Sequence, residues 1–323
     1  MSTARFMVFL SLFLLLPTAF AAKLPGIPGF IDEMVAKHHF KRNELKRLFQ
    51  RAQYKQSVID AITTPATTKP WPEYRAIFVN DQRIQAGLRF WKRYRHTLRR
   101  AEKKYGVPQE IIVALIGVET MYGEHTGTYR AIDALTTLAF KYPQRADFFR
   151  SELEQYLLLA RAQGFNLLGV QGSYAGALGI PLFMPSSYRK YAVDFDHDGK
   201  IDLMNDPVDA IGSVANYLKQ FGWTRGQPVA LRGKIGDAAH APDQSDARST
   251  REWMAAGVVP ESDVQGDAKA RLLDFTMPEG QEFWLAFDNF QVITRYNNSD
   301  FYAMSVYQLA EALDRARHPA TAG

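Results

Sequence analysis

The chain has 323 residues, of which 46% are apolar and 23% are charged, so it can bury a core and is not a disordered or collagen-like chain. It contains no cysteine, which excludes disulfide bonds, thiolate metal sites, cysteine catalysis and a lipidated N-terminal cysteine. Its 39 Lys and Arg against 34 Asp and Glu give a net charge of +5, which is compatible with an anionic polymer or surface as partner.

The first 21 residues have the pattern of a secretory signal peptide. Arg5 precedes an apolar run from Phe6 to Leu16 that is interrupted only by Ser11, and Ala19-Phe20-Ala21 provides small residues for cleavage. The apolar run is about eleven residues long, whereas a helix that spans a bilayer needs roughly twenty. We therefore expect residues 1–21 to be removed and the mature chain to reach the periplasm without a stable membrane anchor. An uncleaved N-terminal anchor is the alternative.

The N-terminal third of the mature chain is predicted to be helical. The spacing of apolar residues over 30–62 predicts two short amphipathic helices, and the prolines and threonines of 63–72 predict a loop. Residues 80–104 are predicted to form one strongly basic helix. Its charged face is either simply solvated or an anion-binding surface.

The rest of the chain is mainly helical, with one stretch of strands. Nearly every residue from 110 to 121 is apolar, which predicts a helix buried on all sides. Short alternating runs begin near Val229, and residues 282–294 have the composition of strands, whereas the polar residues 237–250 are predicted to form a loop. The other predicted helices are 131–140, 146–162, 207–221 and 300–317. These patterns predict a mainly α protein with a small β-containing insertion.

Glu119 is the first candidate for chemistry, because it lies near the end of the all-apolar helix. Burial disfavours the charged form of a carboxyl group, so its pKa is expected to rise. A carboxyl group that is still protonated near neutral pH can serve as a general acid. The alternative is a buried glutamate that only forms a hydrogen bond with a neighbouring element.

An aspartate-rich loop over residues 194–202 is the second candidate. Its carboxylates alternate, and Gly199 stands where an EF-hand calcium loop needs a sharp bend. Asn205 occupies the position of the bidentate glutamate, so Asp206 or Asp209 would have to supply that ligand. The predicted ligands of a structural calcium ion are Asp194, Asp196, Asp198, the carbonyl of Lys200, and Asp209. An aspartate-rich turn without metal is the alternative.

Several separated motifs occur together in one order. They are Glu119-Thr120 with Tyr122-Gly123, Gly-Ser-Tyr-Ala-Gly-Ala at 172–177, Phe-Met-Pro-Ser-Ser-Tyr at 183–188, the aspartate-rich loop, and Arg-Tyr-Asn at 295–297. This order resembles the lytic murein transglycosylase B family, peptidoglycan-cleaving enzymes of the bacterial envelope. The resemblance extends from about Trp71 to Tyr307, and an ordered set is far more specific than any single motif.

The resemblance implies a lysozyme-like helical core, an accompanying helical domain and a small β domain. On this basis residues 22–105 form a helical region that packs on the core, and residues 106–224 form the catalytic core with the calcium loop. Residues 225–290 form the β-containing insertion, and residues 291–323 complete the core.

The resemblance also implies a site. Glu119 would be the sole catalytic acid and base, and the small residues and aromatics of the matching motifs would line a sugar-binding cleft. The implied substrate-binding residues are Arg145, Ser173, Phe183, Tyr217, Tyr296, Asn297 and Tyr302. The chain departs from its relatives at two positions: Gln144 replaces one of two neighbouring arginines, and Leu182 replaces a glutamine that contacts substrate.

The implied activity is cleavage of the β-1,4 bond between N-acetylmuramic acid and N-acetylglucosamine, with formation of 1,6-anhydromuramic ends and without a catalytic cofactor. The expected partners are peptidoglycan glycan strands. We expect a monomer that does not bind nucleic acid, because no nucleic-acid motif accompanies the basic helix. A hydrolytic muramidase and a non-catalytic or weakly active peptidoglycan-binding protein are the alternatives.

Overall fold

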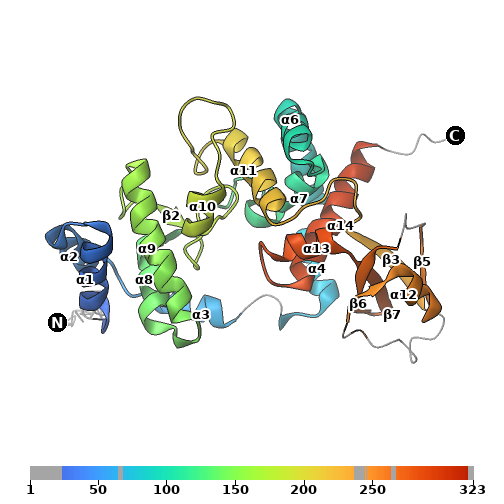
Figure 1. Cartoon of the computed structure of the whole chain (residues 1–323), viewed down its shortest axis with the longest axis horizontal. Coiled ribbons are helices and arrows are strands. Elements are labelled where there is room, and N and C mark those ends of the chain that lie inside the picture. The colour runs from blue at the N-terminus through green and yellow to red at the C-terminus, as the bar shows by residue number, and fades with distance from the viewer. Residues whose placement is uncertain (1–23, 65–67, 236–243, 245, 263–266, 319–323) are drawn as a thin grey trace, which may run out of the picture.

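The computed structural model describes residues 24–64, 68–235, 244, 246–262 and 267–318 (Figure 1). The predicted signal peptide and most of the predicted loop at 237–250 lie outside the described residues. The molecule is elongated, with the first helices at one end, a small β-sheet at the other and most of the helices between them (Figure 1). This confirms the predicted mainly α fold with a small β part. Within the described residues, every helix is too short or too polar to cross a membrane.

Three helices, and not the predicted two, occupy the start of the chain. They are α1 (Ile27–His38), α2 (Arg42–Arg51) and α3 (Gln56–Thr63). The left-handed backbone of His39 (φ 57°) ends α1, and the extended backbone of Ala52 ends α2. The segment that leads into α3 is held by two side chains of α8 (Ala131–Lys141), because the amides of Gln53 and Lys55 donate to Asp133 and Thr137 at 2.9 and 3.0 Å.

The prediction of one basic helix over 80–104 is wrong. Helix α5 (Asp81–Arg93) ends at Tyr94, and α6 (Arg95–Tyr105) begins there. The ring of Tyr94 packs on Phe90, with 4.7 Å between the centroids, and its backbone leaves the helical range at φ −105° and ψ 21°. The predicted loop at 63–72 is also shorter than expected, because α4 (Trp71–Phe78) begins at Trp71.

Helix α7 (Gln109–Thr120) occupies the centre of the molecule, where ten of its twelve residues are buried. It packs against α5, α6, α11 (Pro207–Gln220) and α14 (Asp300–Arg317) (Figure 1). A helix that is apolar on all sides needs neighbours on all sides, so the prediction for 110–121 is confirmed.

Helices α8 and α9 (Ala146–Gln163) pack against each other, and α10 (Pro185–Tyr191) packs on α9. The two-residue strands β1 (Tyr129–Arg130) and β2 (Gln171–Gly172) join the segment after α7 to the segment after α9. This close approach depends on Gly127, which has φ +97° and whose added Cβ would lie 2.0 Å from the carbonyl oxygen of Gly172. A larger residue at position 127 would separate the two segments.

The β part is one five-stranded sheet in the order β4-β6-β7-β3-β5, with every pair antiparallel. Its strands are β3 (Ala230–Ile235), β4 (Arg248–Ser249), β5 (Val258–Pro260), β6 (Lys269–Met277) and β7 (Gly280–Ala286). One face holds a small core that includes Trp253 of α12 (Thr250–Ala255). The other face joins the main core, where Trp71 of α4 stacks on Phe275 with 4.6 Å between the ring centroids.

The strand prediction for 282–294 is correct only as far as Ala286. Residues beyond it form α13 (Asp288–Thr294), because Phe290 and Ile293 stand three residues apart and both are fully buried. That spacing suits one face of a helix and not the alternating faces of a strand. The short helix carries the chain from the sheet back to the core, where α14 begins.

Candidate active site

The end of α7 places Glu119 beside three other segments. Met121 and Tyr122 both have left-handed backbones, with φ 52° and 64°, which reverse the chain immediately after the helix. The hydroxyl of Thr120 donates to the carbonyl of Ile180 at 2.7 Å and accepts from the amide of Gly123 at 3.0 Å. These bonds fix the turn, and with it the carboxyl group of Glu119, against the segment around residue 180.

The surroundings of Glu119 make it a weak acid. Its side chain is partly accessible, yet desolvation by the surrounding protein raises its pKa from 4.5 to about 7. The hydroxyl of Tyr302 donates a hydrogen bond of 2.5 Å to Oε1 and opposes this rise by stabilising the carboxylate. Tyr302 lies in the first turn of α14, whose N-cap is Ser299. Glu119 is therefore poised to gain or lose a proton near neutral pH.

Five tyrosines interact with Glu119 through its charge. They are Tyr74, Tyr174, Tyr217, Tyr296 and Tyr302. Burial, followed by the negative charge of Glu119, raises the pKa of Tyr74 to about 12, so its hydroxyl stays protonated. Tyr174 is 38% exposed and offers an aromatic surface beside the acid. The hydroxyls of Tyr217, Tyr296 and Tyr302 already donate within the protein, whereas a protonated tyrosine without such a bond can donate to a sugar without adding charge to the site.

Sequence reasoning did not identify Tyr74 as a site residue, and it included Tyr174 only as one of the aromatics of a motif. Tyr174 lies in the Gly-Ser-Tyr-Ala-Gly-Ala motif, so its position there was a usable signal. Tyr74 lies on α4, 45 residues before Glu119 in the sequence, and its local pattern is that of an ordinary amphipathic helix. Only the packing of α4 against α14 brings it to the site.

Aromatic packing joins the 181–183 segment to the segment that precedes α14. The rings of Phe183, Tyr217 and Tyr296 lie 4.9 to 5.7 Å apart between centroids. The Tyr296 hydroxyl donates to the carbonyl of Pro181, and the Tyr217 hydroxyl donates to that of Arg295 at 2.6 Å. Phe183 itself is only 2% exposed. It packs behind the tyrosines, so the interpretation of its ring as a sugar-stacking surface does not fit this structure.

The remaining candidate residues differ in their distance from this cluster. Ser173 holds a turn, because its Oγ accepts from the amides of Ala175 and Ala177 at 3.2 and 3.1 Å. Asn297 is exposed immediately after Tyr296. Arg145 lies on the short helix η3 (Pro143–Arg145) between α8 and α9. Its guanidinium group lies over the ring of Phe148, 4.3 Å from the centroid.

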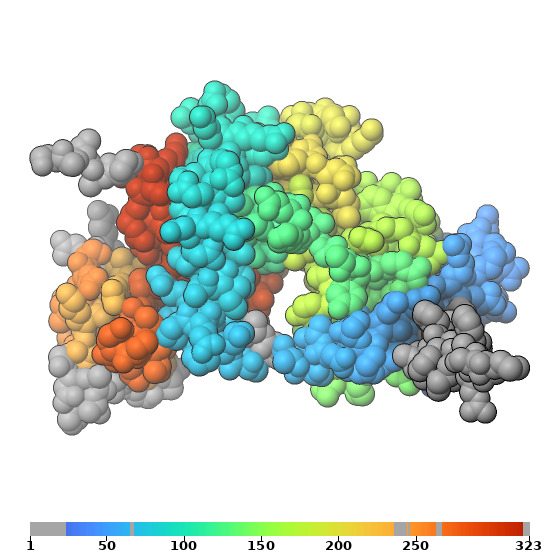
Figure 2. Space-filling model, turned by 180° about the vertical axis from the view of Figure 1, so that it is seen from behind, coloured from blue at the N-terminus to red at the C-terminus, as the bar shows by residue number. Residues whose placement is uncertain are grey.

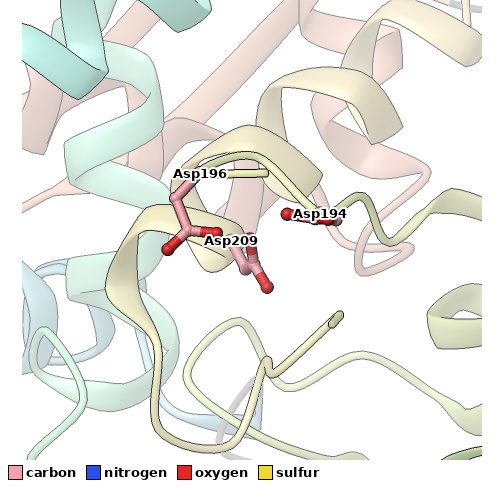
Figure 3. Close-up of side chains that lie close together, drawn as sticks. All are labelled: Asp194, Asp196 and Asp209. Carbon is pink, nitrogen blue, oxygen red and sulfur yellow. The ribbon is translucent and has the colours of Figure 1, made fainter. Parts of the chain in front are cut away.

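The aspartate-rich loop brings together three of the predicted ligands. Oxygen atoms of Asp194, Asp196 and Asp209 all lie within 4.8 Å of one another (Figure 3). Asp209 is 1% exposed, and its two oxygens accept from the amides of Phe195 and Asp202 at 2.7 and 2.8 Å. Calcium binds oxygens at about 2.3–2.6 Å, so ligands on opposite sides of the ion stand about 5 Å apart. The spacing of the three carboxylates fits that ion.

Asp198 and Lys200 are not part of this group of carboxylates. Oδ1 of Asp198 accepts from the amide of Lys200 at 2.8 Å, which closes a turn within the loop. Asp202 likewise accepts from the amides of Met204 and Asn205. Three of the four predicted carboxylate ligands thus lie together, and the carbonyl of Lys200, which is not a carboxylate, stays a predicted ligand. Asp209, rather than Asp206, is the residue that reaches the group, because Asp206 caps α11 through the amide of Val208.

The structure thus places one protonatable glutamate, Glu119, at the end of the central helix of a mainly helical fold. Residues 24–311 match the family model described as a transglycosylase SLT domain. The chain belongs to this family of lytic transglycosylases, as the sequence motifs indicated.

Individual relatives agree with this assignment. The chain is 44% identical over 307 residues to the membrane-bound lytic murein transglycosylase B of Escherichia coli K12, and the match covers 92% of this chain and 84% of that protein. The catenated lytic transglycosylase SltB1 of Pseudomonas aeruginosa has a TM-score of 0.84 and 49% identity, covering 92% of this chain and 99% of that one. The E. coli lytic transglycosylase Slt35 in complex with calcium has a TM-score of 0.86 and 42% identity, covering 97% of this chain and all of the other.

Proposed function

We propose that this protein cleaves the β-1,4 bond between N-acetylmuramic acid and N-acetylglucosamine in peptidoglycan and leaves 1,6-anhydromuramic ends. Family membership supports the reaction class. The observation that carries the proposal for this chain is Glu119, whose pKa is about 7 and whose carboxyl group bonds to Tyr302. At that pKa one group can release a proton in one step and accept one in the next.

The first step breaks the glycosidic bond. Protonated Glu119 donates its proton to the glycosidic oxygen, and N-acetylglucosamine leaves with that oxygen. The carbonyl oxygen of the 2-acetamido group of the muramic acid attacks the anomeric carbon and forms a cyclic oxazolinium intermediate. Tyr302 stabilises the carboxylate that remains on Glu119, because its hydroxyl group already donates to Oε1.

The second step closes the new ring. The Glu119 carboxylate removes the proton from the muramic acid O6 hydroxyl, and O6 attacks the anomeric carbon. The bond from that carbon to the acetamido oxygen breaks, which leaves the 1,6-anhydro sugar and a protonated Glu119. We infer that the side chains near Ser173 and Asn297 orient the acetamido group. No water is consumed, and the enzyme returns to its starting protonation state.

The surroundings of Glu119 favour this route over hydrolysis. Hydrolytic glycosidases commonly use two carboxyl groups, about 5–5.5 Å apart in retaining enzymes and about 6.5–9.5 Å apart in inverting ones. In the part of the chain that the structure describes, the pKa of Glu119 responds to burial and to Tyr302, and no second carboxylate contributes to it. A mechanism in which the substrate supplies its own nucleophile needs only one carboxyl group.

The direct test is digestion of purified sacculi followed by mass spectrometry of the products. The proposal predicts anhydromuramic ends from the wild type and none from Glu119→Gln. Reducing ends would identify a hydrolytic muramidase, and binding without any turnover would identify a peptidoglycan-binding protein. Both results would contradict the proposal.

The departure at Leu182 concerns binding more than chemistry. Leu182 has a left-handed backbone (φ 48°), and its amide donates to the carbonyl of Gly179 at 3.1 Å. The residue lies between Pro181, which accepts from Tyr296, and the buried Phe183. Replacing the glutamine of relatives by leucine removes an amide at this position, and Glu119 itself is retained. We therefore expect altered sugar affinity and an active enzyme.

We further propose that Asp194, Asp196 and Asp209 hold a structural calcium ion. The structure of Slt35 in complex with calcium and the spacing of these three carboxylates support the proposal. A bound ion would stabilise the loop and take no part in bond cleavage. The mature protein would act in the periplasm as a monomer on glycan strands, after removal of residues 1–21, without nucleic-acid binding or a membrane anchor.

A further inference from the structure

The positive charge of the molecule is concentrated on α5 and α6. Residues 81–105 contain nine Lys and Arg against two acidic residues, an excess larger than the +5 of the whole chain. Figure 2 shows these helices, in cyan and teal, on the surface of one face, where they border a hollow. The exposed cations are Arg89, Lys92, Arg93, Arg95, Arg99, Arg100, Lys103 and Lys104.

Five of these cations, which we call the basic stripe, are Arg89 and Lys92 on α5 and Arg95, Arg99 and Lys103 on α6. Within each helix they stand three or four residues apart, which is the spacing of neighbours on one side of a helix. Among the described residues, no Asp or Glu oxygen lies within 4 Å of a nitrogen of the stripe. No carboxylate of the described residues therefore neutralises the charges of the stripe.

The other cations of these helices have partners in the fold. Arg100 donates to the carbonyl of Phe195 at 2.5 Å and lies over its ring, 4.3 Å from the centroid. Lys104 lies over the rings of Tyr105 and Phe195. These residues hold α6 against the aspartate-rich loop. The stripe has no comparable structural role.

Helix stability accounts for only part of the stripe, because Lys92 and Lys103 lie in the last turn of a helix, where a positive charge is favourable, whereas Arg89, Arg95 and Arg99 do not. Like charges three or four residues apart repel each other and destabilise a helix, so uncharged polar residues would suit an isolated solvated face better. The stripe also lacks the large apolar residues that insert into a bilayer, because all of the exposed large apolar side chains among the described residues belong to other elements. Its composition suits a hydrated anionic polymer with repeated charges.

We propose that the basic stripe is a second binding surface, which holds the carboxylates of peptide stems on the insoluble peptidoglycan while the cleft acts on a glycan strand. This inference rests on the proposed function. Helices α5 and α6 both pack on α7, the helix that carries Glu119, so stripe and acid belong to one rigid unit. Peptide stems project from many positions of a cross-linked polymer, so stems beyond the cleaved strand can reach the stripe.

The test measures binding to intact sacculi in the Glu119→Gln background, which leaves the polymer undigested. The stripe variant is Arg95→Gln, Arg99→Gln, Lys103→Gln. The control is Lys46→Gln, Arg47→Gln, Arg51→Gln, which removes three exposed cations of α2 that form no ion pair with another described residue. Both variants change the net charge equally. We expect the stripe variant to bind at least about threefold more weakly, and the control to differ by less than about twofold.

Three further measurements distinguish binding of peptide-stem carboxylates from a general loss of charge and from damage to the cleft or the fold. Adding salt should weaken wild-type binding more than binding of the stripe variant. Sacculi whose peptide stems have been removed by an amidase should bind both proteins equally. With Glu119 restored, the stripe variant should cleave short soluble muropeptide oligomers at the wild-type rate and unfold at the same or a higher temperature, because repulsion along α6 is relieved.

Equal binding of the stripe and control variants to intact sacculi would overturn the proposal. Loss of binding to phosphatidylglycerol vesicles, with sacculus binding unchanged, would also overturn it, because the stripe would then be a lipid-binding surface. Failure of the proposed function has a different signature. It appears as absence of anhydromuramic products from the wild type, whatever the state of the stripe.

Discussion

The hydrogen bond from Tyr302 to Glu119 allows a quantitative prediction. Tyr302→Phe removes the hydroxyl that donates to Oε1 at 2.5 Å and leaves the ring in its buried position. A hydrogen bond to a charged group contributes about 1.5–3 kcal/mol, and one pKa unit corresponds to about 1.36 kcal/mol. The pKa of Glu119, which is about 7 in the wild type, should therefore rise by about one to two units in the variant.

Two kinetic effects follow from the loss of this hydrogen-bond free energy. The first step needs protonated Glu119, so the alkaline limb of the pH profile of kcat/KM should move upward by about one to two units. The carboxylate formed in that step loses its donor, so kcat/KM below the limb should fall by roughly 10- to 150-fold. The assay follows muropeptide oligomer cleavage from about pH 5 to pH 10.

Tyr296→Phe is the matched control, because the Tyr296 hydroxyl donates to the carbonyl of Pro181 and not to Glu119. Its removal should leave the alkaline limb where it is in the wild type. If Tyr302→Phe also leaves the limb unmoved, or moves it to lower pH, the Tyr302 bond does not control the protonation of the catalytic acid.

Glu119→Gln should lower turnover about 10²- to 10⁴-fold, and activity within about threefold of wild type would exclude Glu119 as the acid. Because burial raises the folded-state pKa of Glu119 from 4.5 to about 7, the native state favours the bound proton, and that stabilisation is lost as pH rises through about 7. Denaturant unfolding should thus show the Gln variant up to about 3 kcal/mol more stable than wild type at about pH 8, and equal to it at about pH 4. Calcium should raise the unfolding temperature without being needed for turnover. At a hundred times its dissociation constant, calcium should add about 2.7 kcal/mol to the free energy of unfolding. Asp194→Asn with Asp196→Asn should abolish this response, and an equal midpoint in chelator and in excess calcium would refute the metal site. Leu182→Gln should raise activity on muropeptide oligomers by about tenfold or less, whereas recovery from no activity by many orders of magnitude would mean that the natural chain is only a binder.

The local sequence pattern was sufficient to predict those helices that are surrounded by the protein core on all sides. Helix α7 could be predicted because its residues are apolar on every side, and its buried position follows from that composition alone. The break at Tyr94 could not be predicted, because the basic pattern continues across it and nothing in the local sequence signals the change of backbone conformation there. Over 282–294 the aromatic and β-branched residues are compatible with a strand or with a buried helix. Beyond Ala286 the chain is helical, because Phe290 and Ile293 are both buried against the core.

In the candidate site, too, some residues could be predicted from the local sequence and others are brought there only by tertiary packing. Glu119 could be singled out from its apolar helix, and the aspartate-rich loop from its own spacing. The contact between Glu119 and Tyr302 joins residues 183 positions apart, so only the order of family motifs pointed to it. Tyr74 reaches the site through helix packing, for which the local sequence carries no signal. Phe183 stands in a matching motif, yet its burial shows that a motif residue can support neighbouring tyrosines instead of facing a cleft.

Digestion of sacculi in water enriched in ¹⁸O tests the central claim most directly. If Glu119 alone acts as acid and base and the muramic O6 closes the ring, mass spectrometry will show anhydromuramic ends that carry no ¹⁸O. Reducing muramic ends labelled with ¹⁸O, lost in Glu119→Gln, would show that water is the nucleophile and would contradict the account.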